Sequence, residues 1–293
     1  METLQIDSRG LQICRNPIFV MGSPRSGTTV LARALARHPD FWASDETLFM
    51  PALFGGGRVE SEIERWTSRP RGSWLRRQNV SREEFLSYLG MGLNALFTNR
   101  SEGKRWIDHT PHHVLMAEVL AAMFPGAFFL HLLRDGRRVV HSMIHFSDKL
   151  AEDQREEMKA GGFFPAWVTN FKVACQTWQE RTAAGLVFCE KHPERALNVR
   201  LEELAQNPGQ AFGDVLNFLQ ATPSDAPGKY FHRHRFNSSF STSVIVGDMA
   251  AEEPPDPWES WTAEQKALFN QIAGRTMSCL ESLESNASLQ ATA

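Results

Sequence analysis

The amino-acid sequence predicts an α/β protein with three layers, in which a central parallel sheet is flanked by helices. Two short and almost wholly apolar runs, at 17–21 and 127–133, have the character of strands that are buried on both faces. Each run is followed within a few residues by a segment whose apolar residues have helical spacing. Chains that alternate strands and helices in this way form parallel sheets covered by helices on both sides.

Length and composition agree with this class. The chain has 293 residues, of which 42% are hydrophobic and 22% are charged, as in ordinary globular proteins. We expect one domain over 1–293 with its core at about 16–220. A net charge of −3 gives no reason to expect nucleic acid as a partner. The four cysteines lie far apart in the sequence, which favours free thiols in a reducing compartment and predicts no metal site: Cys14, Cys175, Cys189 and Cys279.

The sequence predicts a cytoplasmic protein without a membrane span. Residues 1–17 contain no apolar stretch of the kind found in signal peptides. The segment Val114–Leu133 is apolar and about as long as a membrane span. It is interrupted by Glu118, Gly126 and His131, however, and fits a helix, a turn and a buried strand much better.

The loop between the first strand and the first helix has the features of a phosphate cradle. It runs from Gly22 to Thr29, and a helix is expected at 28–37. Backbone N–H groups of such a loop and the positive end of the helix point at one anion. The spacing G-x-x-x-x-G-x-T makes the fold P-loop-like, but Thr28 stands where a P-loop has lysine, and Arg25 supplies the cation instead. We therefore expect a 5′-phosphate with at most one further anionic group, bound by Ser23, Pro24, Arg25, Ser26, Gly27, Thr28 and Thr29.

The next segments are expected to form the acceptor side of a binding site. Residues 41–47 predict a second strand or a loop close to the first helix, and 51–105 is irregular apart from a helix at about 81–97. Ser81 and Glu84 have the spacing of a capping box at its start. Variable insertions in α/β enzymes usually build substrate pockets, although a solvated basic face explains this one equally well. Aromatic residues that suit the mouth of a pocket are Trp42, Trp66, Trp74, Phe163 and Phe164.

A second candidate phosphate site follows the apolar strand at 127–133. Arg134 stands directly after this strand, and Ser142 lies on the helix that begins by about Arg138. Ligands in open α/β sheets bind at the carboxyl ends of strands. A guanidinium there can donate two hydrogen bonds to a phosphate, and the hydroxyl adds a neutral donor.

The remaining elements complete the predicted layers. A short strand ends at 106–111 and is followed by a helix at 112–123. Further along we expect a candidate lid at 146–165, a helix at 165–192, a strand at 196–200, a helix at 208–219, a loop at 221–260 and a final helix at 263–283.

Four segments in order resemble those of sulfotransferases that use 3′-phosphoadenosine 5′-phosphosulfate (PAPS). PRSGTT resembles the 5′-phosphosulfate loop, and RDGRRVVHS the 3′-phosphate segment. FPGAFFLHLL and VRLEEL resemble the segments next to them, so that the resemblance covers most of 17–220. RHPDFWASDET and RDGRRVVHSMI are most similar to the group that includes tyrosylprotein sulfotransferases.

The resemblance implies roles for individual residues. Arg134 and Ser142 would hold the 3′-phosphate, and Glu46, which matches the last glutamate of that group's EET motif, would be the general base. Arg200 stands close to the position that usually covers the adenine, and we include it among the cofactor-binding residues. Because the usual aromatic residue is absent there, the group that covers the adenine stays open.

One departure from the family pattern bears on catalysis. The family places a lysine where this chain has His109, and that lysine donates to the bridging oxygen of the departing phosphate. Histidinium can donate in the same way, which would make transfer sensitive to pH near neutrality. Two alternatives stay open: Arg25 carries this charge, or the base is His109, His112 or His113 rather than Glu46.

The sequence therefore predicts a sulfotransferase that moves the sulfuryl group of PAPS to a hydroxyl of a small-molecule or carrier-tethered acceptor and releases 3′,5′-phosphoadenosine (PAP). Glu46, His109 and Arg25 are its expected catalytic residues, and it needs no metal. Two alternatives are a nucleotide or small-molecule kinase that uses ATP and Mg²⁺, and a PAP-binding protein without turnover. The identity of the acceptor and a homodimer stay open.

Overall fold

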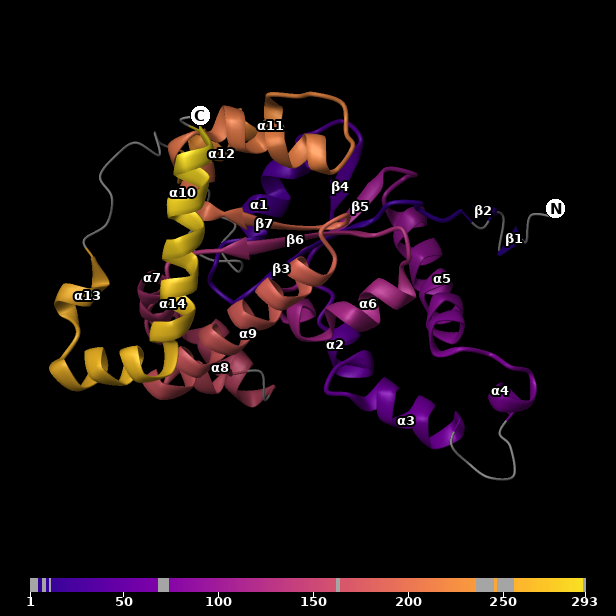
Figure 1. Ribbon diagram of the computed structural model, residues 1–293, viewed down its shortest axis with the longest axis horizontal. Coiled ribbons are helices and arrows are strands. Elements are labelled where there is room, and N and C mark those ends of the chain that lie inside the picture. The colour runs from indigo at the N-terminus through magenta and orange to yellow at the C-terminus, as the bar shows by residue number, and fades with distance from the viewer. Residues whose placement is uncertain are drawn as a thin grey trace.

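A five-stranded parallel sheet forms the centre of the structure, a computed structural model (Figure 1). The described residues are 5–6, 9–10, 12–67, 74–161, 164–235, 245–246 and 256–291. In spatial order the strands of the sheet are β4 (Phe41–Ala43), β5 (Arg105–Asp108), β3 (Ile18–Gly22), β6 (Phe128–Leu133) and β7 (Ala196–Arg200). The predicted fold class is confirmed.

The middle strand β3 is buried on both faces, as its apolar run predicts. It pairs with β6 from Ile18 opposite Phe128 to Gly22 opposite Leu132. Because side chains alternate along a strand, Phe19 and Met21 enter one hydrophobic cluster, whereas Ile18 and Val20 enter the cluster on the opposite face.

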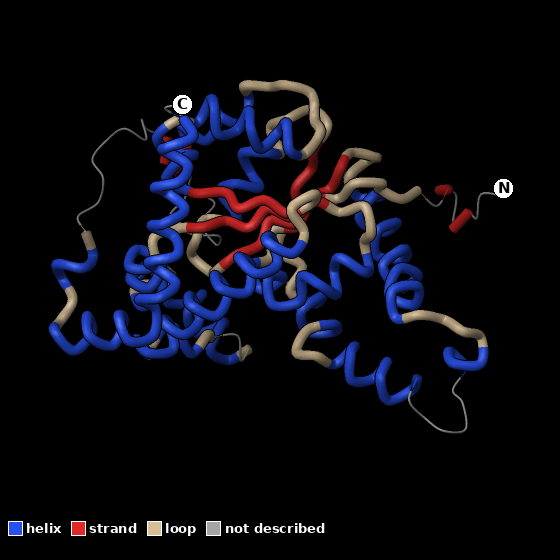
Figure 2. The backbone as a smooth tube through the Cα atoms, in the orientation of Figure 1, coloured by secondary structure: helices blue, strands red, loops and turns tan. Residues whose placement is uncertain are grey.

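Helices cover both faces of the sheet (Figure 2). Phe19 and Met21 share their cluster with side chains from α5 (Arg82–Arg100), α6 (Ala117–Met123) and α9 (Phe171–Lys191). The opposite cluster contains side chains from α1 (Thr28–Leu35), α11 (Pro208–Phe218) and α12 (Ala226–Arg233). A third cluster joins α9 to α7 (Gly136–Ile144) and α14 (Ala263–Ala291).

Two segments expected to be irregular contain helices. The described residues between β4 and the predicted helix α5 contain α2 (Phe49–Phe54), α3 (Arg58–Thr67) and α4 (Trp74–Arg77), none of which was predicted. The predicted cap of α5 is present, since the Glu84 N–H donates to Ser81 Oγ at 3.0 Å. The segment 221–260, expected to be a loop, begins with α12, whose Phe231 is buried against Phe212 of α11.

The other elements depart from the predicted bounds by smaller amounts. The expected helix at 112–123 begins as the 3₁₀ helix η1 (Pro111–Met116), and the final helix continues to Ala291. The candidate lid contains η2 (Ser147–Lys149) and α8 (Glu152–Ala160), while 162–163 lie outside the described residues. The remaining elements are β1 (Gln5–Ile6), β2 (Arg9–Gly10), η3 (Ala166–Val168), α10 (Leu201–Gln206), β8 (His234–Arg235), β9 (Ile245–Val246) and α13 (Pro257–Ser260).

None of the helices within the described ranges has both the length and the apolar character needed to cross a membrane.

Candidate active site

The predicted phosphate loop leaves the carboxyl end of β3, where two glycines permit its path. A Cβ on Gly22 would lie 2.7 Å from the Leu132 carbonyl oxygen of β6, so no side chain fits there. Gly27 caps α1 with a φ of 108°, in the left-handed region that favours glycine. Between them the Ser26 N–H donates to the Ser23 carbonyl at 3.1 Å and closes a turn.

The loop leaves hydrogen-bonding capacity available for an anion. The first turn of α1, which contains Thr28 and Thr29, has no side-chain cap at Gly27, so its N–H groups point out of the helix end. Ser26 is only 1% exposed, and its Oγ has no hydrogen-bond partner in the structure as described. A buried hydroxyl without a partner costs free energy, and an anion oxygen seated in the loop is a natural acceptor for it.

The structure brings the two predicted phosphate sites into contact. The Arg134 Nη1–H donates to the Arg25 carbonyl at 3.1 Å, and the Arg25 Nε–H donates to Ser142 Oγ at 3.4 Å. The Arg25 guanidinium also lies over the Phe146 ring, 5.1 Å from its centroid. Residues that are more than a hundred positions apart in the sequence therefore form one cationic site at the carboxyl ends of β3 and β6.

Both arginines of this site are largely buried. Burial lowers the pKa of Arg25 to about 10, with a further decrease from the charge of Arg134 and an opposing increase from Glu46. Burial also lowers the pKa of Arg134, which the Glu202 carboxylate partly offsets. Both side chains stay protonated at neutral pH, and two adjacent desolvated cations favour a ligand with more than one negative charge.

Glu46 and His109 meet at the ends of the neighbouring strands β4 and β5. Glu46 Oε1 lies 4.0 Å from His109 Nδ1. Burial raises the pKa of Glu46 to about 7, and the Asp108 carboxylate adds to this increase, whereas Arg25 opposes it. Burial lowers the pKa of His109, which Asp108 partly offsets. Burial therefore moves both pKa values in the direction that favours the neutral forms.

Asp108 is a buried member of the site for which the sequence predicted no role. Its Oδ1 accepts from the N–H of Thr110 at 3.0 Å and from the hydroxyl of Thr110 at 2.8 Å. Its Oδ2 accepts from the hydroxyl of Thr47. The Thr47 N–H in turn donates to Thr110 Oγ1 at 2.7 Å. The signal in the sequence is an acidic residue at a strand end, next to a histidine and before Thr-Pro.

The two other histidines considered as bases lie in less suitable surroundings. His113 is fully buried, lies edge-on to Phe19 with a centroid separation of 5.5 Å, and has its pKa lowered by burial. His112 Nδ1 accepts from the Arg181 guanidinium at 3.2 Å, and burial with the Arg181 charge lowers the pKa of His112 to about 4. These contacts favour Glu46 or His109 as the base.

Arg200, predicted to bind the cofactor, is engaged with the C-terminal helix. Its Nη1–H donates to the Leu280 carbonyl of α14 at 3.2 Å, and its guanidinium lies 3.9 Å from Glu202 and 3.8 Å from Glu203. Its role in ligand binding stays a prediction.

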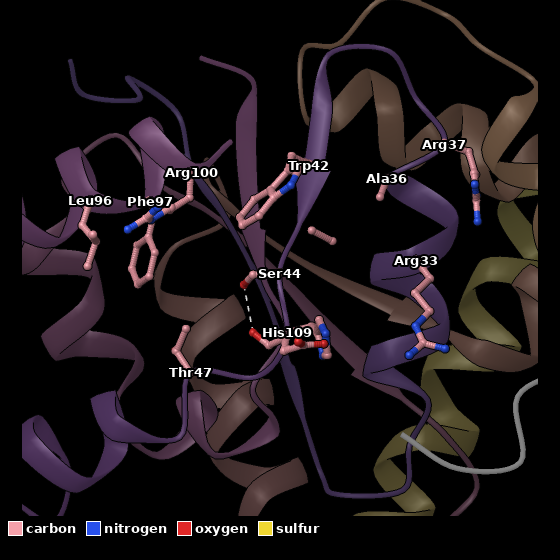
Figure 3. A pocket seen from close by; sticks show the side chains of 12 residues that line it. Arg33, Ala36, Arg37, Trp42, Ser44, Thr47, Leu96, Phe97, Arg100 and His109 are labelled. Atoms are coloured by element: carbon pink, nitrogen blue, oxygen red, sulfur yellow. Dashed lines mark hydrogen bonds between the residues drawn. The ribbon is translucent and has the colours of Figure 1, made fainter. Parts of the chain in front are cut away.

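A cavity of about 910 Å³ is lined by His109 and by Asp45 and Thr47, the two sequence neighbours of Glu46, while Glu46 itself is not part of the lining. In Figure 3, α1 with Arg33 stands on one side of it and α5 with Phe97 on the other, with Trp42 between them. Its full lining is Arg33, Ala36, Arg37, Trp42, Ala43, Ser44, Asp45, Thr47, Leu96, Phe97, Arg100 and His109.

Of the aromatic residues expected at the mouth of a pocket, only some are placed there. Trp42 lines the cavity, as predicted. Trp66 and Trp74 are 42% and 62% exposed and are not part of this lining, and Phe164 packs in the cluster of α7, α9 and α14. Phe163 lies outside the described residues. The inserted segment contributes to the cavity through α5. Throughout the described ranges no group of three His, Cys, Asp or Glu side chains is arranged to hold a metal ion.

Comparisons with known proteins agree with this geometry. The protein-tyrosine sulfotransferase 1 of Danio rerio is 26% identical over 210 residues, which is 71% of this chain and 54% of the relative. The protein-tyrosine sulfotransferase of Drosophila melanogaster is 26% identical over 212 residues, 71% of this chain and 39% of the relative. The chain thus spans about half, or less, of the length of these relatives.

A sulfotransferase from Mycobacterium tuberculosis has a similar solved structure, with a TM-score of 0.50 and 17% identity over 90% of this chain and 78% of that one. This likeness shows the fold. The pattern of the Sulfotransferase family matches residues 17–225, which is more than half of the chain. The protein therefore belongs to the sulfotransferase family, which its phosphate loop and its RDGRRVVHS segment resemble.

Proposed function

We propose that this protein moves the sulfuryl group of PAPS to the hydroxyl of an acceptor and releases PAP. The observation that carries the proposal is the contact chain from Arg134 through Arg25 to Ser142, which joins a 5′-phosphate loop to a candidate 3′-phosphate site. A kinase needs no 3′-phosphate site, and the loop lacks the lysine that P-loop kinases use on the terminal phosphates.

In this proposal the phosphate loop and the first turn of α1 bind the 5′-phosphosulfate, and Arg134 with Ser142 binds the 3′-phosphate. PAPS supplies an activated sulfuryl group. Glu46 takes the proton of the acceptor hydroxyl, whose oxygen forms a bond to sulfur while the bond from sulfur to the bridging oxygen breaks. Protonated His109 donates to that bridging oxygen, and Arg25 stabilises the negative charge that develops on it.

The cavity beside Glu46 is the proposed acceptor site. Trp42 and Phe97 provide aromatic walls of the same cavity as His109, and Glu46 Oε1 lies 4.0 Å from His109 Nδ1. The acceptor class predicted from the sequence is a hydroxyl on a small molecule or a carrier, and the names of the tyrosine-specific relatives favour a phenolic one. A cytoplasmic location and a homodimer stay predictions.

The test measures PAP release from labelled PAPS with a simple phenol and with a tyrosine peptide, against a peptide in which phenylalanine replaces the tyrosine. We expect sulfated product only with the hydroxyl acceptors, and about 10²–10⁴-fold slower turnover with nearly unchanged PAP affinity for Glu46→Gln. The matched control is Glu83→Gln, which changes a carboxylate that is 70% exposed on α5. Phosphoryl transfer from ATP and Mg²⁺, or PAP binding without any transfer, would contradict the proposal.

A further inference from the structure

The backbone that carries Glu46 is held in place through the next residue. Glu46 lies in the irregular segment between β4 and α2, so no ladder of a sheet or helix fixes it. The neighbouring Thr47 is 8% exposed and is tied twice to the end of β5, by its N–H to Thr110 Oγ1 at 2.7 Å and by its hydroxyl to Asp108 Oδ2.

Asp108 is the centre of this arrangement. It is 1% exposed, and it accepts three hydrogen bonds, one from Thr47 and two from Thr110. Thr110 is fully buried and bonds to both Asp108 and Thr47. The three residues form a buried network, beside which His113 Nδ1 lies 3.7 Å from Asp108 Oδ1, and hydrogen bonds to a charged acceptor in such surroundings are stronger than in water.

We propose that Asp108, acting through Thr47 and Thr110, is a positioning residue that holds Glu46 beside the acceptor cavity. The inference rests on the proposed sulfuryl transfer and goes beyond it, because it assigns a role to three residues to which that mechanism gives no step, one of which, Thr47, also lines the proposed acceptor cavity. A base misplaced by about 1 Å can slow a reaction by about 10²-fold, so a buried network is a reasonable means of fixing an irregular segment.

The network also gives Asp108 an electrostatic effect that a purely structural residue lacks. The groups whose charges act on Glu46 are Asp108 of β5, Arg25 of the phosphate loop and Asp45 of its own segment, and His109 lies within 4.0 Å. The negative charge of Asp108 raises the pKa of Glu46 and also that of His109. Removing this charge therefore shifts both pKa values downward.

The first experiment compares Thr47→Val with Thr47→Ser in the full-length protein. Valine has the shape of threonine but no hydroxyl, whereas serine keeps the donor to Asp108. We expect kcat to fall by about tenfold to 10²-fold for Thr47→Val and by less than about threefold for Thr47→Ser. PAP affinity by titration calorimetry should match that of the native protein in both. A native kcat for Thr47→Val, or equal losses in the two variants, would overturn the inference.

The second experiment records the pH dependence of kcat for Asp108→Asn, which keeps the shape of the side chain and removes its charge. We expect both limbs of the profile to move to lower pH while PAP affinity is retained. Unmoved limbs would show that the charge of Asp108 does not act on Glu46 and His109, and a native kcat at the pH optimum would refute the positioning role. If the native protein transfers no sulfuryl group at all, the proposed function itself fails. If the native protein is active and the variants behave like it, only the positioning role fails.

Discussion

At the scale of single residues, burial gives Glu46 and His109 pKa values that oppose their proposed roles. The pKa of Glu46 is raised to about 7 and that of His109 is lowered, so the protein without ligand favours a neutral pair near pH 7. Transfer needs the opposite charges, carboxylate and imidazolium. The negative phosphosulfate would favour the imidazolium, which couples donor binding to the charge of His109.

His109→Lys tests this coupling. Since Glu46 must be deprotonated while His109 is protonated, the native rate should rise with pH, reach a maximum and fall above the higher of the two pKa values. Lysine, with an ordinary pKa of about 10.4, stays charged. The rate of the variant should therefore rise through the pKa of Glu46, about 7, and remain level to about pH 9. The measurement is single-turnover sulfuryl transfer against pH.

His109→Ala serves as the control, and it should be slow at every pH. If the native and lysine proteins share one descending limb, His109 is not the acid.

Arg134→Ala should separate recognition of the 3′-phosphate from binding of the rest of the donor. Loss of a charge-assisted contact costs about 1.5–3 kcal/mol, which is at least tenfold in affinity. PAP should lose at least this much by titration calorimetry. The affinity for adenosine 5′-phosphosulfate should fall less. This ligand is affected only by the loosening of the loop, which occurs because Arg134 also holds the Arg25 carbonyl.

The neighbouring Arg137→Ala is the matched control, since Arg137 pairs with Asp135 instead. Equal losses for PAP and for adenosine 5′-phosphosulfate would remove Arg134 from 3′-phosphate recognition.

At the scale of elements, the sequence predicts those segments in which the pattern of apolar residues is clearly that of a strand or of a helix. The runs that became β3 and β6 are apolar on both faces, and the loop between β3 and α1 is recognisable from its glycines. Helix α3 was missed because its surface is mostly exposed and polar, with Ile63 its buried contact, and α2 because it is a short apolar segment interrupted by a proline. Helix α12 was missed because one of the helices against which it packs, α1, is distant in the sequence.

The candidate active site could likewise be predicted only in part from the sequence. The phosphate-loop residues, Arg134, Ser142 and Glu46 could be proposed from motifs, whereas their mutual contacts could not. The proposed role of Asp108 depends on the hydrogen bond from Thr47, which follows β4 and is 61 positions away, and spacing along the chain does not encode that contact.

Packing between α9 and the sheet makes Gly185 a site where alanine should destabilise the protein. Gly-to-Ala changes inside helices usually stabilise by up to about 1 kcal/mol. A Cβ on Gly185, however, would lie 2.2 Å from Nε2 of His131, whose ring is fully buried and bonds to Asn198 at 2.8 Å. We expect Gly185→Ala to lower the free energy of unfolding by about 1–3 kcal/mol in a denaturant titration.

Gly213→Ala in α11 is the control, because a Cβ there meets nothing within 4 Å, and it should be neutral or stabilising. A stabilised Gly185→Ala protein would show that α9 does not approach β6 so closely.

At the scale of the whole molecule, the donor site joins parts of the chain that are far apart in sequence. The loop after β3 contacts the last turn of α7 through Arg25 and Ser142. The first residue of α7, Gly136, donates its N–H to Met277 Sδ of α14 at 3.3 Å, and the Leu280 carbonyl of α14 accepts from Arg200 at the end of β7. A ligand bound at the carboxyl ends of β3 and β6 is therefore connected through these hydrogen bonds to α7, α14 and β7.

PAP should for this reason raise the melting temperature of the whole chain in one transition. A ligand at about 100 times its Kd stabilises the native state by about 2.7 kcal/mol, which corresponds to roughly 4–5 °C for a chain of this size. The measurement is calorimetric melting with PAP, with adenosine 5′-phosphosulfate and with ATP and Mg²⁺ at equal concentrations. We expect the largest rise in melting temperature with PAP. In Arg134→Ala the rise with PAP should be no larger than the rise with adenosine 5′-phosphosulfate. A larger rise in melting temperature with ATP and Mg²⁺ than with PAP would favour a kinase, because only a site that binds the 3′-phosphate prefers PAP to the two ligands that lack this group.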